Sequence, residues 1–362
     1  MLRSKKTLWV VGLLMFCLII KWYSSDAERV EFGYSNRFFA GFSQLLRKAL
    51  GVLSISIGDI LYGCIVAWLI YKTGRVLFFV FSNKQKGAFK LKAKQNSFTI
   101  FVIGSVLYII FNLFWGINYN RKGIAWQLGL SEMKYGAAEL KEINCLLIAK
   151  INIAKQSVVK RQQGYPTNKQ LFKAVNNAYE LLGNKYAFLK YEPSSLKSSM
   201  WGWFGNYANF TGYYNPFTGE AQVNTSIPKF LQPFTACHEV AHQLGYAKEM
   251  EANFVGYLAA AASSDTLFHY SVYLDLFAYA NRNLFEVDSA TARLYRRELI
   301  APVKADLKEW FLFNQKHIGL LEPLVRWGYG KFLQSNEQPQ GLLSYDEVTG
   351  FLIAYYKKYG KI

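Results

Sequence analysis

Three long apolar stretches stand out in the first 118 residues of the chain. They cover residues 7–23, 52–71 and 98–117, and each is close to the length of a helix that crosses the hydrocarbon core of a membrane. The first stretch follows basic residues, so a cleaved signal peptide is an alternative, but no clear small-residue cleavage site follows it. We therefore expect a membrane region in residues 1–118 with three spanning helices, the first an uncleaved anchor.

The second stretch contains one acidic residue, Asp59. A carboxylate inside hydrocarbon is costly and often marks a functional site. The plainer interpretation, which we favour, places Asp59 near the interface at the start of the helix, where the positive end of the helix dipole stabilises a carboxylate.

The distribution of charge predicts the orientation in the membrane. Residues 1–96 carry 15 Lys and Arg against 4 Asp and Glu, and residues 72–97 hold seven of these basic residues and no acid. Short loops rich in Lys and Arg stay on the cytoplasmic side. We expect residues 24–51, with a short amphipathic interfacial helix near residues 42–48, and everything after residue 117 to lie outside the cytoplasm.

Composition supports a membrane protein over a nucleic-acid-binding one. The chain is 52% hydrophobic and 18% charged, below the roughly 25% charge of soluble domains. Its net charge of +18 lies mainly beside the apolar stretches, so membrane topology explains it and we expect no nucleic-acid partner. The four cysteines form no CxxC pair, which argues against a cysteine zinc site. We expect Cys145 and Cys237 to be buried free thiols, with a disulfide as the alternative.

Residues 119–362 predict one mainly helical domain outside the membrane. Residues 198–227 are instead rich in Gly, Asn and aromatic residues, and the turn sequence of residues 215–219 predicts a β-hairpin. The expected fold class is therefore a membrane-anchored, mainly α (α+β) protein with a small sheet. Helices are predicted, from periodicity and capping residues, at residues 131–155, 168–182, 234–244, 248–262, 268–282, 289–313 and 344–359.

The helix at residues 234–244 carries the sequence His238-Glu239-Val240-Ala241-His242. Two histidines four positions apart share one helix face, so both can bind one metal ion. Glu239 can then reach a water beside the metal and act as its general base. The alternative is an ordinary helix with two packed histidines. We expect a Zn²⁺ cofactor held by His238 and His242.

A catalytic zinc needs a third protein ligand. The extended motif HExxHxxGxxH would place a histidine at position 248, but the residue there is Lys248, which excludes that class. The nearby carboxylates are Glu249 and Glu251, and from the residues alone either could be the ligand. Either could also be a solvated acid at a helix start.

The segment Glu249-Met250-Glu251-Ala252-Asn253 resembles the second-helix motif, E-x-x-A-D or E-x-x-x-D, of gluzincin-type metallopeptidases. The resemblance implies that Glu249 binds zinc, with Glu251 as the second choice. It also implies that Asn253, which stands where that family has Asp, accepts a hydrogen bond from a ligand histidine. The expected domain is accordingly a zincin-like metallopeptidase domain.

Over nearly its full length the chain is similar to a family of bacterial membrane proteins, mainly from Bacteroidota, of unknown function. The resemblance implies a zinc peptidase and brings no established substrate. From the topology above we expect a protein of the bacterial inner membrane with its catalytic domain on the periplasmic side, and as partners the lipid bilayer and a peptide or cell-envelope substrate. The similar segments are residues 58–62, 115–119, 216–220 and 238–254.

The weaker expectations concern substrate binding and alternative functions. Tyr213 and Tyr214, before the turn, are candidates for binding substrate as an added β-strand. A residue that stabilises the oxyanion could be His269, Tyr270, Tyr273 or Tyr345. The run at residues 201–204 could bind substrate, contact lipid or simply pack in the core.

The alternative function is a catalytically silent membrane receptor or envelope assembly factor. An intramembrane protease is disfavoured because residues 230–246 are too polar to span a membrane.

Overall fold

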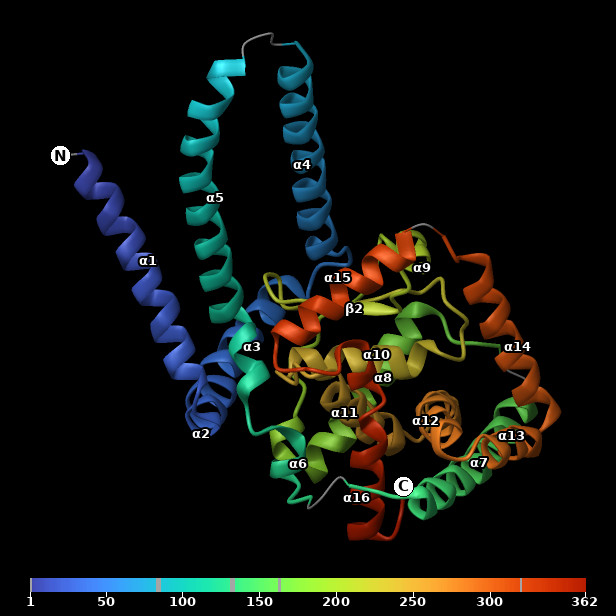
Figure 1. The fold of residues 1–362 in the computed structure, drawn as a ribbon. Coiled ribbons are helices and arrows are strands. Elements are labelled where there is room, and N and C mark those ends of the chain that lie inside the picture. Colours follow the sequence, from blue (N-terminus) through green and yellow to red (C-terminus); the bar gives the residue numbers. More distant parts are fainter. Residues whose placement is uncertain (1, 83–85, 131–133, 162–163, 320) are drawn as a thin grey trace.

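The computed structural model describes residues 2–82, 86–130, 134–161, 164–319 and 321–362 (Figure 1). Three long helices, α1 (Leu2–Ser24), α4 (Ile57–Ser82) and α5 (Lys86–Phe114), extend to one side of a globular part. Among the described residues, two segments are long and apolar enough to cross a membrane, Lys6–Ser24 and Ile57–Phe78. The apolar stretch in α5, Phe98–Phe114, is shorter. The chain is therefore mainly helical, with two helices that could span a membrane.

The long helices differ from the prediction at their ends. The second begins at Ile57, five residues later than expected from residues 52–71, and the third ends at Phe114 because Trp115 leaves the helical conformation. Between α1 and α4 the chain forms α2 (Ala27–Arg29), the π-helix η1 (Val30–Phe39) and α3 (Ala40–Leu50), which contains the predicted interfacial helix.

The globular part contains most of the expected helices with shifted bounds. The helix expected at residues 131–155 is Ala137–Lys160; residues 131–133 lie outside the described part of the chain. The helix expected at residues 289–313 is two helices, broken at Leu299 and Ile300 before Pro302. The helices are α6 (Gly123–Gln127), α7 (Ala137–Lys160), α8 (Asn168–Lys185), α9 (Gly202–Ala208), α10 (Gln232–Gln243), α11 (Glu249–Ala262), α12 (Thr266–Val287), α13 (Ser289–Glu298), α14 (Ala301–Lys316), α15 (Leu321–Ser335) and α16 (Val348–Tyr359), with short 3₁₀ turns η2 (Gly116–Asn120), η3 (Ala187–Leu189) and η4 (Gly341–Tyr345).

A three-stranded sheet lies beside α10. Its strands are β1 (Leu196–Ser198), β2 (Gly212–Asn215) and β3 (Glu220–Val223), in the order β1-β3-β2. The predicted hairpin is present as the antiparallel pair of β2 and β3, and β1 joins β3 in parallel. β2 is therefore an outer strand of this sheet.

The foot of α4 packs against the sheet face opposite α10. Asp59 is buried there, where it accepts hydrogen bonds from the Met200 amide, at 2.6 Å, and from the Tyr213 hydroxyl. The Glu220 carboxylate accepts from the first two amides of α4, Ile57 and Gly58. Asp59 thus lies at the start of its helix, as we favoured, and it ties that helix to β2.

The main core forms where α7, α8, α10, α11, α12 and α16 meet. α11 is buried along nearly its whole length, which small residues such as Gly256 and Ala260 permit. All four cysteines are free. Cys237 is buried as expected, but Cys145 is exposed because it faces outward from α7, so the expectation of two buried thiols is wrong for Cys145.

Candidate metal centre

The helix that carries the HExxH sequence is buried and has clear ends. Pro233 lies in the first turn of α10, where its missing N–H is not needed. Gly245 ends the helix with a φ of +87°, a conformation that glycine adopts without strain. The chain reverses there, so α11 starts only a few residues later and packs against α10.

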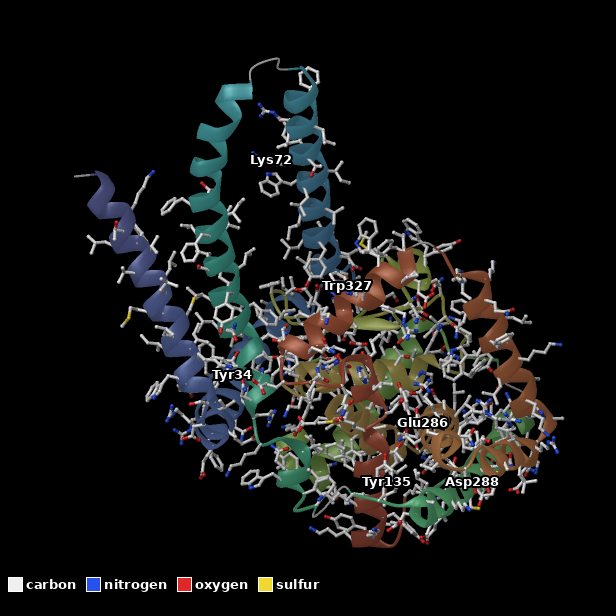
Figure 2. All side chains as sticks on the ribbon, in the orientation of Figure 1. Tyr34, Lys72, Tyr135, Glu286, Asp288 and Trp327 are labelled. Carbon is white, nitrogen blue, oxygen red and sulfur yellow. The ribbon has the colours of Figure 1, made fainter. Side chains whose placement is uncertain are left out.

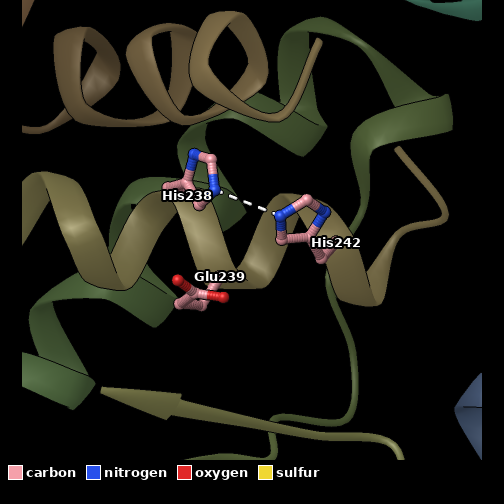
Figure 3. Close-up of side chains that lie close together, drawn as sticks. All are labelled: His238, Glu239 and His242. Carbon is pink, nitrogen blue, oxygen red and sulfur yellow. Dashed lines mark hydrogen bonds between the residues drawn. The ribbon is translucent and has the colours of Figure 1, made fainter. Parts of the chain in front are cut away.

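The two imidazoles face one another on α10 (Figure 3), with 3.1 Å between His238 Nε2 and His242 Nε2. His238 Nδ1 lies 2.7 Å from Asn253 Oδ1, and His242 Nδ1 lies 2.7 Å from the Tyr246 carbonyl oxygen. Both of these partners are acceptors, so each neutral ring carries its proton on Nδ1. The two Nε2 lone pairs then point at the same space, which a cation between them would satisfy.

Glu249 completes a triangle with the two histidines. Its Oε2 lies 3.3 Å from His238 Nε2 and 3.5 Å from His242 Nε2, and it is buried without a hydrogen-bond partner. Zinc held tetrahedrally at roughly 2.0–2.1 Å would separate its ligand atoms by about 3.3 Å. The three donor atoms have this spacing, so their geometry and their chemical types fit a zinc ion.

The other oxygen of Glu249 is also held in place. Tyr329 on α15 donates a hydrogen bond to Glu249 Oε1 at 2.7 Å, and the Glu249 amide donates to the Gln338 side chain at 2.9 Å. Residues far along the chain therefore fix both the carboxylate and the backbone of this candidate ligand.

Glu251 points away from the histidines. A side chain built on Gly123 would collide with its carboxylate, which places Glu251 beside α6. Burial raises the pKa of Glu251, although the nearby Lys248 and Arg121 oppose that rise. Of the two carboxylates that the sequence left open, the structure brings Glu249, and not Glu251, to the histidine pair.

Arg121 supports the C-terminal end of α10. It forms a buried ion pair with Glu31, at 2.7 Å, and donates to the carbonyl oxygens of Leu244 and Gly245. Removing one partner of such a buried ion pair destabilises a fold, because the other charge is left buried and unpaired. This pair joins η1 to the turn that precedes Glu249.

The charges of the cluster are strongly coupled. Burial opposes a charge on His238, but the carboxylates of Glu249, at 3.3 Å, and of Glu239 raise its pKa to about 9. Burial disfavours the charged form of Glu249, yet the two histidines hold its pKa well below the usual range. The triangle therefore favours a positive charge at its centre.

Glu239 lies beside the triangle as a separate carboxylate. One donor atom from each of His238, Glu239 and His242 lies within 4.8 Å of the others. Its Oε2 is buried without a hydrogen-bond partner, and burial raises the pKa of Glu239 to about 7. A Cβ atom on Gly212 of β2 would lie 2.6 Å from Glu239 Oε1, so the glycine leaves the room that this carboxylate occupies.

Two tyrosines approach the site from the C-terminal part of the chain. The ring of Tyr345 lies nearly parallel to that of His238, with 6.3 Å between the ring centroids, and its hydroxyl is 3.2 Å from that of Tyr329. The other oxyanion candidates lie elsewhere, since His269, Tyr270 and Tyr273 contact Ser263, Asp306 and Ile362, respectively. Only Tyr345 of the four predicted candidates lies at the histidines.

The two predicted substrate-binding tyrosines lie on opposite faces of β2. Tyr213 faces Asp59 and the foot of α4, away from α10. Tyr214 faces the site. The centroid of its ring lies 4.7 Å from that of the Trp115 ring, and the Trp115 centroid lies 5.9 Å from that of the His242 ring. This alternation follows from the pleat of a strand.

Three of the surrounding residues are not among the predicted site residues. Tyr329 lies on α15, a helix that periodicity does not predict. Trp115 belongs to the predicted third span, residues 98–117, but in the structure it follows the end of α5. Gly212 precedes the predicted hairpin tyrosines and could have been noticed as a glycine at a strand start.

A comparison with protein families adds one result. A family model described as "Protein of unknown function (DUF3810)" matches residues 34–353. The chain belongs to this family. No curated protein and no solved structure matches the chain, so the resemblance of residues 238–253 to gluzincins depends on the motif and on the geometry described above. Membership of the DUF3810 family confirms the expected family of unknown function and assigns no activity.

Proposed function

We propose that this protein is a membrane-anchored zinc metallopeptidase. The observation that carries the proposal is the triangle of His238 Nε2, His242 Nε2 and Glu249 Oε2, whose sides measure 3.1, 3.3 and 3.5 Å. Both Nδ1 atoms are occupied by oxygen acceptors, as is usual for metal-binding histidines. Asn253 supplies one of these acceptors in place of the Asp of gluzincins, so it orients His238 without adding charge.

The residues around the triangle have the chemistry of peptide hydrolysis. A zinc ion held there would supply a Lewis acid that brings the pKa of a water to about 7. Glu239, with its unpartnered oxygen, takes the proton from the attacking water and later gives it to the leaving nitrogen. The Tyr345 hydroxyl, next to Tyr329, is the candidate donor to the oxygen that gains negative charge.

The outer edge of β2 suits an extended peptide. The Asn224 amide donates to the Thr211 carbonyl, so these two residues form a hydrogen-bonded pair at the start of the β2–β3 ladder. Residue pairs along an antiparallel ladder alternate between hydrogen-bonded and non-hydrogen-bonded, so the backbone groups of Gly212 and Tyr214 point away from β3. A substrate strand paired with these groups would lie directly beside Glu239, which packs over Gly212. The peptide bond of such a strand would be presented to the general base.

The orientation follows from the charges around the candidate spans. The basic segment at residues 72–97 favours the cytoplasmic side, which places the triangle outside the cytoplasm, in the periplasm of a bacterial cell. A peptide or cell-envelope substrate would be accessible there. A cytoplasmic location of a reporter fused after residue 117 would contradict this topology.

The proposal is tested with the full-length chain in detergent or nanodiscs. We expect about one zinc per chain by metal analysis, lost in His238→Ala and His242→Ala. Glu239→Gln should keep the zinc and lose at least about 100-fold of the cleavage of a quenched-fluorescent peptide library, because the general base is missing. A wild-type chain without stoichiometric zinc, or an undiminished Glu239→Gln variant, would contradict the proposal. In the second case a silent receptor would fit better.

A further inference from the structure

Helix α15 lies across the globular part at the level where the long helices enter it (Figure 1). Near its C-terminal end, the ring of Phe332 lies 5.8 Å from that of Phe111 on α5. α15 also packs against α9. Trp201, the residue before α9, donates a hydrogen bond to the Asp59 carbonyl on α4, and a Cβ atom placed at Gly63 of α4 would touch its ring. α15 and α9 therefore bridge the feet of α4 and α5.

The outward face of α15 is apolar. Leu321, Leu324 and Trp327 are exposed by 46, 65 and 65%, and they lie within an arc of about 120° around the helix. Figure 2 shows Trp327 at the foot of α4. On the opposite side of α15, Leu333 is buried and Tyr329 reaches Glu249. The helix is thus amphipathic with its apolar side turned outward, which is the reverse of an ordinary surface helix.

The apolar surface continues onto the segment at α9. Trp203 is 61% exposed and Met200 is 56% exposed. The run at residues 201–204 is therefore not packed core, one of the three interpretations that the sequence allowed. We call Met200, Trp203, Leu321, Leu324 and Trp327 together the α9–α15 face.

We infer that the α9–α15 face is immersed in the boundary between headgroups and acyl chains of the same bilayer that α1 and α4 cross. The face is continuous with the feet of α4 and α5, the depth at which lipid headgroups surround those helices. Tryptophan is enriched at this depth in membrane proteins, and an amphipathic helix lies in the plane with its apolar side inward. Lys331, one turn beyond Trp327, can reach the headgroups with its amine while its stem stays apolar.

Lipid is favoured over a protein partner because of where the face lies. A protein that covered α15 would also have to displace the lipids around α4, which is exposed along the described part of its apolar length. The inference requires that α1 and α4 cross the membrane, and it is independent of whether the triangle binds metal.

Immersion would bring the site close to the bilayer surface, because α15 contributes Tyr329 to Glu249 from its other side. A substrate for such a site would be a polypeptide held near the membrane, for example by its own span or lipid anchor. This consequence depends on the proposed function, whereas the immersion itself does not.

The test measures depth by spin labelling of the full-length chain in nanodiscs. The four native cysteines are replaced by Ala or Ser, and Leu324→Cys is compared with Ile153→Cys. Ile153 is also 65% exposed and belongs to α7, a helix that Figure 1 shows at the opposite end of the globular part from the long helices. We expect the label at position 324 to be accessible to oxygen and shielded from a water-soluble nickel complex, and the label at position 153 to show the reverse.

Equal nickel accessibility at the two positions would overturn the inference. So would a label at position 324 that is shielded from both reagents, because a protein would then cover the face. Quenching of tryptophan fluorescence by lipids brominated near the headgroup provides a second measurement that needs no cysteine replacement. Trp327→Phe should lower the quenched fraction, and an unchanged fraction would also contradict immersion.

Discussion

The Tyr329 hydroxyl donates a 2.7 Å hydrogen bond to Oε1 of Glu249, whose other carboxylate oxygen faces both histidines. The bond therefore fixes the rotation of the carboxylate and decides which oxygen is free for a metal ion. Partners of this kind, outside the ligands themselves, typically change metal affinity by about 10–100-fold.

We predict that Tyr329→Phe weakens zinc binding by about tenfold and leaves the fold intact, because the carboxylate gains freedom to turn. The measurement is competition with a chromophoric chelator. Tyr359→Phe, at an exposed tyrosine on α16, is the matched control and should bind zinc like the wild type. Equal affinity of the two variants would show that the hydrogen bond does not hold the ligand.

The two glutamates of α11 should behave differently. Glu249→Gln should lower zinc affinity by more than about 100-fold, since it removes a ligand rather than a partner of one. Glu251→Gln should change the affinity by less than about threefold, because Glu251 lies beside Gly123 and not at the histidines. Metal titration of both variants, with circular dichroism to compare their folding, distinguishes them. A larger loss in Glu251→Gln would reverse the assignment.

Zinc affinity should rise with pH. The carboxylates around His238 overcome its burial and raise its pKa to about 9, and a protonated imidazole cannot bind metal. Below that pKa zinc must displace the proton, so we expect affinity to rise by up to about tenfold per pH unit and to level off above pH about 9. Chelator competition between pH 6 and 10 measures this slope.

The Glu239→Gln variant provides the control for the pH profile. It removes one of the carboxylates that raise the pKa of His238, so the plateau should begin at a lower pH. A flat profile in the wild type would mean that no proton is displaced when the metal binds.

Gly212→Ala should reduce peptidase activity by about 100-fold, the loss expected when a catalytic group is displaced by about 1 Å, and should leave zinc bound. The new Cβ would lie 2.6 Å from Glu239 Oε1 and 2.8 Å from the Gln222 carbonyl oxygen. The control is Gly104→Ala on α5, where a Cβ has no neighbour within 4 Å. Activity in Gly212→Ala equal to that of the control would argue against Glu239 as the base.

The sequence predicted best the features whose signals are local. The helix that carries HExxH, its end at Gly245 and the hairpin turn are each specified by residues within a few positions of the feature itself. The choice between Glu249 and Glu251 was not local, because side chains two positions apart on a helix point about 160° apart and packing decides which one faces the histidines. That packing is visible at Gly256, where a Cβ would lie 3.0 Å from the His238 amide nitrogen.

Long-range contacts account for most of what the sequence did not predict. α15 contains Pro323, Gly328 and Gly330, which disfavour a helix in the sequence, and it carries its exposed apolar residues on its outer side. Its pattern therefore does not resemble that of a helix packed on a core. Tyr329 consequently gave no indication that it reaches Glu249. The helix predicted at residues 289–313 is two helices because Pro302 suits the first turn of a new helix, which helical periodicity alone does not distinguish from a continuous one.

The candidate ligands His238, His242 and Glu249 lie close together along the chain, and this affects how the site can form. His238 and its hydrogen-bond partner Asn253 are 15 positions apart, whereas Tyr329 lies 80 positions beyond Glu249. Closing a short loop costs little chain entropy, so pairing of α10 with α11 can bring the three donor atoms together early in folding. If the triangle binds zinc, as proposed, the ion can enter before α15 is in place, and the docking of α15 then closes over the occupied site.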